Sequence, residues 1–118
     1  MLIRSAQMAA LDAVARLDSE EHIFELLCQH FRATPAWTSD EAAAALVRAA
    51  VAKTTGYGMP AARDAFKVAV LMLVFGPSFD REEPWARRIL EARSGEAPVA
   101  EILYREGIER VREREAAS

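Results

Sequence analysis

The longest apolar stretch of the chain is Ala65–Phe75, in which Lys67 is the only polar side chain. A helix formed by this stretch is apolar on almost every face, and such a helix is normally surrounded by other elements. Pro60 suits its first turn, and Gly76-Pro77 is a stop signal. The pattern predicts a central hydrophobic helix over residues 60–75. Its apolar run of 11 residues is shorter than the roughly 18 to 20 that span a membrane, so we expect no membrane insertion.

Two apolar stripes precede this helix. Ser5 is placed to cap a first helix that runs to about Leu17, and Asp18 followed by Glu21 has the spacing of a capping box. The second stripe consists of Ile23, Phe24, Leu27, Cys28 and Phe31. Because no glycine or proline separates the stripes, a single kinked helix over residues 4–32 fits the pattern equally well.

A third helix is predicted after the Thr34-Pro35 connector. Thr38 or Ser39 is placed to cap its start, and Gly56 is a natural left-handed residue at its end. Four alanines and one leucine form a face of mostly small residues on this helix: Ala42, Ala45, Leu46, Ala49 and Ala50. Since the distance between two packed helices depends on the side chains at their contact, we expect this face to lie against the central helix.

The rest of the chain predicts two further helices. Pro84 is placed to start the first and Pro98 the second. Beyond Tyr104 the sequence is rich in Arg and Glu, which predicts a solvated helix that frays from about residue 112. Together these patterns predict an all-α fold, with residues 1–118 forming one domain: a bundle of about five to six helices around the central one.

Composition and charge indicate which class of partner to expect and in which cellular compartment the protein acts. The chain of 118 residues has a formal net charge of −3, and its arginines are interleaved with glutamates. No excess basic field is present, so we expect no nucleic-acid partner. Cys28 is the only cysteine, which rules out an intrachain disulfide and fits a reducing compartment. Since the start of the chain also lacks the apolar region of a signal peptide, a cytoplasmic location is predicted.

The sequence lacks the common signatures of catalysis, including a glycine-rich phosphate loop and a Gly-x-Ser-x-Gly elbow. The best candidates for a metal or nucleophilic site are His22, Cys28 and His30. The two histidines are eight positions apart, whereas metal sites on a helix normally use pairs three or four apart. Cys28 lies on an apolar stripe, where cysteine usually acts as a small hydrophobe. We predict no catalytic residue, metal or cofactor; a small helical metal-binding protein or enzyme using these three residues is the alternative.

Residues near the helix ends are candidate contacts for a partner protein: Arg63, Asp64, Lys67, Phe79, Asp80, Trp85, Trp37 and Tyr57. The charges at the start of the central helix form either a partner-facing patch or an internal ion-pair cluster. Asp80 is also placed to favour the dipole of the helix that follows it. The four aromatic residues lie near helix junctions, where they act either as interface anchors or as core residues.

Short motifs at the helix ends and in the predicted core resemble those of a known family. They are Tyr57-Gly58, Arg63-Asp64, Leu73-Val74-Phe75-Gly76-Pro77, Phe79-Asp80, Pro84-Trp85-Ala86 and Ile89-Leu90, with Ile3-Arg4, Gln7 and the helix ending at Phe31. They resemble small, mostly uncharacterised helical proteins encoded near type VI secretion spike components in proteobacteria. The segment Arg81-Glu82-Glu83 is shorter than the insert that such proteins often carry before the Pro-Trp pair. The resemblance specifies a fold more than a chemistry, and it supplies no catalytic residues.

The resemblance and the missing catalytic signatures lead to one hypothesis. We expect a non-catalytic helical protein-interaction module, acting as a cytoplasmic adaptor or chaperone for a type VI secretion effector or spike component. A close alternative is an immunity protein that binds and blocks a toxin. A homodimer that pairs through a small-residue or aromatic face is a further possibility.

Overall fold

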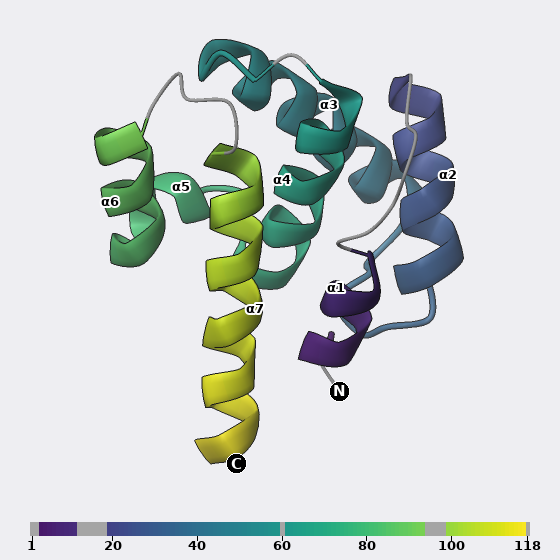
Figure 1. The fold of residues 1–118 in the computed structure, drawn as a ribbon. Coiled ribbons are helices and arrows are strands. Elements are labelled where there is room, and N and C mark those ends of the chain that lie inside the picture. Colours follow the sequence, from purple (N-terminus) through teal and green to yellow (C-terminus); the bar gives the residue numbers. More distant parts are fainter. Residues whose placement is uncertain (1–2, 12–18, 60, 94–98, 118) are drawn as a thin grey trace.

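The computed structural model describes residues 3–11, 19–59, 61–93 and 99–117, which form seven helices and no strand. In chain order the helices are α1 (Ser5–Leu11), α2 (Glu20–Phe31), α3 (Asp40–Gly56), α4 (Ala62–Phe75), α5 (Phe79–Glu82), α6 (Pro84–Arg93) and α7 (Val99–Ala117). Figure 1 shows them as one bundle, with α5 a short turn of helix between α4 and α6. The predicted all-α fold is confirmed.

Helix α4 is the predicted central helix. Eight consecutive residues, Ala65–Met72, are buried, and α4 contacts α2, α3, α5 and α7. It ends at Phe75, and the cap residue Gly76 that follows has φ 108°, a conformation that residues other than glycine rarely adopt. The helix begins at Ala62 instead of Pro60, which lies outside the described residues. None of the helices in the described ranges is both long and apolar enough to cross a membrane.

The structure separates α1 from α2. Ser19 has an extended backbone with φ −154° and ψ 160°, and its hydroxyl accepts a hydrogen bond from the backbone N–H of His22 at 3.1 Å. A helix therefore begins at this point, and the alternative of one continuous helix over residues 4–32 is wrong. The predicted cap Asp18 lies outside the described residues.

Ser5 does not cap α1 as predicted, because it is already the first residue of the helix. The preceding backbone N–H, that of Arg4, donates to Gln7 Oε1 at 2.8 Å. Ser5 instead binds α7: its backbone N–H and its hydroxyl donate to the carboxylate of Glu115 at 3.2 and 2.6 Å. This contact fixes α1 near the end of α7, which is helical as far as Ala117. Fraying of α7 in solution from about residue 112 stays a prediction.

Helix α3 turns a different face to the core from the one predicted. Its buried residues are Ala43, Val47, Ala50 and Thr54, whereas Ala42, Ala45 and Ala49 are exposed and Leu46 is half-buried. The observed face places Val47 in the core and still packs Leu46 partly against it, so more apolar surface leaves the water than if Leu46 and the alanines alone faced inward. Of the predicted small-residue face only Ala50 is buried, and Leu46 packs partly against the core.

The turn after α3 also differs from the prediction. Gly56 is the last residue of the helix, and the left-handed residue is Gly58, with φ 78°. The backbone N–H of Met59 then donates to the carbonyl of Thr54 at 2.7 Å. The chain is thereby turned back toward α4.

Candidate functional site

The outer face of α3 forms one side of an apolar groove. The groove has a volume of about 540 Å³, which is within the range of ligand-binding pockets. Residues 36–39 of the α2–α3 connector and the end of α4 complete it. Its lining residues are Ala36, Trp37, Thr38, Ser39, Ala42, Ala43, Ala45, Leu46, Ala49, Met72, Leu73, Gly76 and Pro77. We call this feature the α3–α4 groove.

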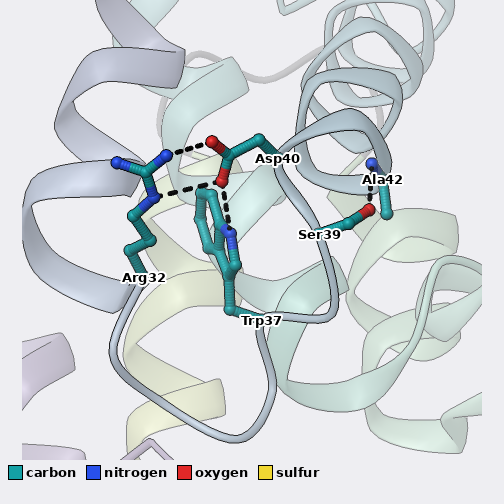
Figure 2. A network of polar contacts seen from close by, with 5 residues as sticks. All are labelled: Arg32, Trp37, Ser39, Asp40 and Ala42. Carbon is teal, nitrogen blue, oxygen red and sulfur yellow. Dashed lines mark hydrogen bonds and ion pairs between the residues drawn. The ribbon is translucent and has the colours of Figure 1, made fainter.

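Trp37 contributes an aromatic side chain to this groove, and a network of polar contacts holds it. Its indole Nε1 donates a hydrogen bond to Asp40 Oδ1 at 3.0 Å. Arg32 Nε donates to the same oxygen at 3.1 Å, and Arg32 Nη2 forms an ion pair with Oδ2. Figure 2 shows Asp40 between the guanidinium and the indole. One carboxylate thus joins the end of α2 to the start of α3 and orients the indole.

The start of α3 is fixed by a second contact in the same network. The hydroxyl of Ser39 accepts from the backbone N–H of Ala42 at 3.0 Å, as expected for the predicted cap (Figure 2). The ring of Trp37 lies 6.2 Å from that of Phe24, measured between centroids. The connector therefore contacts α2 through Phe24 and the start of α3 through Asp40, and the side chain of Trp37 is half-buried.

The charge of Asp40 is favoured by its neighbours. Hydrogen bonds from Arg32 and from Trp37 lower the pKa of Asp40, and the bond to Asp40 raises the pKa of Arg32. Both groups therefore stay ionised at neutral pH. Because both side chains are exposed, this pair orients Trp37 more than it stabilises the fold.

Removal of the Asp40 carboxylate is expected to loosen Trp37. In a Trp85→Phe background Trp37 is the only tryptophan, and Asp40→Ala then deletes the acceptor of its indole N–H. We expect stronger quenching of its fluorescence by acrylamide, with unchanged helicity by circular dichroism. Glu41→Ala, which removes the neighbouring exposed carboxylate, is the control. Equal quenching in both variants would contradict a clamp on Trp37.

Half of the eight candidate contacts lie in the interior. Lys67, Phe79, Asp80 and Trp85 are buried, at 5%, 1%, 4% and 5% exposure. Phe79 and Trp85 pack together, with ring centroids 6.3 Å apart. Of the two roles that the sequence allowed for these aromatic residues, interface anchor or core residue, the structure shows the core role for Phe79 and Trp85.

Trp37, Tyr57 and Asp64 are half-buried, and Arg63 is exposed. Arg63 and Asp64 lie at the start of α4, whereas the α3–α4 groove lies at its end. Burial raises the pKa of Asp64, although the charges of Arg63 and Lys67 oppose this shift. Of the eight candidates, Trp37 alone lines this groove.

Asp80 is the centre of a buried polar cluster. It forms an ion pair with Lys53, with Nζ 2.9 Å from Oδ1, and its Oδ2 accepts from the hydroxyl of Tyr57 at 2.8 Å. Burial opposes the charged form, but the bonds from Lys53 and Tyr57 outweigh it, and the pKa of Asp80 is lowered. Burial and the bond to Asp80 raise the pKa of Tyr57. The cluster ties α5 to the end of α3.

The buried ammonium of Lys67 has a different environment. Its Nζ lies 5.8 Å from the centroid of the Tyr104 ring, a distance typical of a cation–π contact. The hydroxyl of Tyr104 donates to the carbonyl of Met8 at 2.9 Å. This part of α4 therefore connects to α7 and, through it, to α1.

The candidate metal ligands do not gather into a cluster. His22 and His30 are exposed, and Cys28 is half-buried on α2. Burial raises the pKa of the Cys28 thiol, which makes the reactive thiolate scarcer at neutral pH. In the part of the chain that the structure describes, no three His, Cys, Asp or Glu side chains form a group that could hold a metal ion.

Sequence reasoning missed several residues of these sites. It found the alanines of the α3–α4 groove but placed them in the core, and it did not single out Arg32, Asp40 or Lys53 as contacts. An available signal was the spacing of Ala42, Ala45 and Ala49, since apolar positions three and four apart mark one helix face even when that face is outside.

Comparison with known proteins gives no match: no family model, no curated protein and no solved structure shows significant similarity to this chain. The resemblance to proteins encoded near type VI secretion genes therefore stays a prediction.

Proposed function

We propose that this protein is a non-catalytic interaction module whose α3–α4 groove receives an apolar helical segment of a partner protein. The observation that carries the proposal is the groove itself: an apolar hollow of about 540 Å³ with Trp37 held beside it by Asp40. Aromatic residues held in place beforehand are typical anchors of protein interfaces, because little side-chain entropy is lost on binding.

The shape of the α3 face favours a helix as the occupant. Ala42, Ala45 and Ala49 line the groove over two turns of α3 and are exposed. Short side chains leave room for the backbone of a second helix to approach closely. Leu73 at the end of α4 adds apolar surface that a helix with an apolar stripe can cover.

The resemblance in the sequence suggests which partners to test first. A type VI secretion effector or spike component is the proposed partner, and the proposed place of binding is the cytoplasm. An immunity role would use the same kind of binding with a toxin as the partner.

A pair of matched variants tests the proposal. Ala45→Arg places a long charged side chain in the groove, whereas Ala52→Arg adds the same side chain to an exposed position of α3 that does not line it. Arginine is a good helix former, so both variants should fold. In co-purification from the native host with mass spectrometry, we expect the wild type and Ala52→Arg to recover the same effector or spike protein and Ala45→Arg to lose it.

Three outcomes would contradict the proposal. A well-expressed wild-type bait that recovers nothing reproducible would overturn the adaptor role. Retention of the partner by Ala45→Arg would show that binding uses another surface. Self-association in sedimentation that is lost only in Ala45→Arg would make a second copy of this chain the occupant, in place of another protein.

A further inference from the structure

A second groove lies between α6 and α7, which are in contact; in Figure 1 α6 is at the left, beside the upper part of α7. It consists of two hollows of about 430 and 250 Å³ that share three lining residues: Trp85, Arg88 and Arg110. The two hollows therefore adjoin and form an elongated depression along both helices. We call it the α6–α7 groove.

The charged residues that line the groove are three arginines and three glutamates. The larger hollow is lined by Arg88, Arg110 and Arg114 and by two acidic residues, Glu83 and Glu113. Glu106 lines the smaller hollow, so positive and negative side chains are equal in number over the whole groove, whereas the chain carries a formal net charge of −3. Attraction of an anionic group to this place therefore depends on which of the three arginines is already paired within the protein.

The carboxylates of the groove already have partners within the protein. Glu83 Oε1 accepts from Trp85 Nε1 at 3.0 Å. Glu106, in the smaller hollow, accepts from Arg110 Nε at 2.8 Å, and Glu113 lies 3.8 Å from Arg110 Nη1. Arg110 is therefore paired along its own helix. Among the described residues, none of these carboxylates forms an ion pair with the arginine that lines the groove from the facing helix α6.

That arginine is Arg88. Its side chain is exposed and lines both hollows, and it has no hydrogen bond, ion pair or ring contact with any residue in the described segments. A guanidinium carries five N–H donors in a planar fork that matches the two oxygens of a carboxylate. Beside it, the guanidinium of Arg114 lies 4.8 Å from the centroid of the Phe75 ring.

We propose that the α6–α7 groove binds an acidic peptide segment of a partner protein, with a carboxylate paired to Arg88 and held near Arg110. A peptide fits better than a single small anion, because the depression extends over two hollows along the helices. This inference concerns a different surface from the α3–α4 groove, so it can be tested independently of the proposed function.

The test is a titration of the ¹⁵N-labelled full chain with a short peptide rich in Asp and Glu, followed by NMR. We expect shifts at residues of α6 and α7, and binding that weakens as salt is added. Arg88→Gln should weaken binding about tenfold or more, since it removes a charge-assisted hydrogen bond. Arg87→Gln removes the same charge from a neighbouring exposed position outside the groove and should leave the affinity nearly unchanged.

Two results would overturn the inference. Equal weakening by Arg87→Gln and Arg88→Gln would show general electrostatic attraction in place of a site. Saturation of the same shifts by inorganic phosphate at similar concentrations would assign the groove to small oxyanions and remove the case for a peptide.

Discussion

Asp80→Asn is expected to lower the free energy of unfolding by about 3 kcal/mol at neutral pH. The substitution keeps the shape of a side chain that is 4% exposed and removes the charge that pairs with Lys53 at 2.9 Å. Loss of one partner leaves the other charge poorly compensated, which is the costly way to break a buried pair. The Lys53 side chain is 19% exposed and can still reach water, so we expect the low end of the usual range.

Urea unfolding followed by circular dichroism measures this loss. Glu82→Gln is the matched control, because Glu82 is an exposed carboxylate two residues away in the same short helix. The control should change the free energy of unfolding by less than about 0.5 kcal/mol. If Asp80→Asn unfolds at the same urea concentration as the control, the Lys53–Asp80–Tyr57 cluster does not support the fold.

The same pair predicts a dependence on pH. The pKa of Asp80 is lower in the folded chain than in the unfolded one, where an aspartate has a pKa of about 3.9. A lowered folded pKa contributes stability above the unfolded value, and this stability is lost as the pH falls through the folded value. The difference between the wild type and Asp80→Asn should therefore be constant near neutrality and shrink below about pH 4.

The effect of Gly107→Ala on stability is expected to change sign when Leu71 is also replaced by alanine. Leu71 is fully buried, and its truncation should cost about 3 kcal/mol. At Gly107 an added Cβ would lie 2.5 Å from Leu71 Cδ2, so Gly107→Ala forces the leucine to move. The strain of about 1 to 3 kcal/mol opposes a gain of about 1 kcal/mol in helix propensity, and the single variant should be neutral to destabilising.

In the Leu71→Ala background that clash is gone. Gly107→Ala should then stabilise the chain by up to about 1 kcal/mol, which a double-mutant cycle of urea unfolding detects. Gly56→Ala is the control: no atom lies within 4 Å of its added Cβ, so its effect should be the same in both backgrounds. Additive effects of Leu71→Ala and Gly107→Ala would contradict close packing of α7 on α4 at this point.

Local signals explain why much of the fold could be predicted. The run Ala65–Phe75 has too little polar surface to lie anywhere but inside, so the central helix followed from hydrophobicity alone. Gly76 ends the central helix through its own backbone conformation, and Ser39 caps α3 through a residue three positions away. The predicted helix ends at Ser5 and Gly56 were wrong by only one or two residues, because neighbouring residues compete for the same cap position.

The candidate sites were harder to predict because their contacts join distant segments. Asp80 and Lys53 are 27 positions apart, and Asp80 also has a plausible local role. The cap position proposed for Asp80 was such a role, and in the structure its carboxylate binds Lys53 and Tyr57 instead. Nothing in the spacing of these residues reveals the pair, since it depends on how α5 lies against α3.

The sequence by itself determined that this chain forms helices around one buried helix, because periodicity and helix caps act over a few residues. Only the tertiary structure decided which face of α3 turns inward and which of the candidate residues stay accessible. Two faces of α3 are rich in small residues, and the choice between them depends on the area that each buries against all of its neighbours. By packing Val47 inside, the fold leaves Ala42, Ala45 and Ala49 outside, next to Trp37.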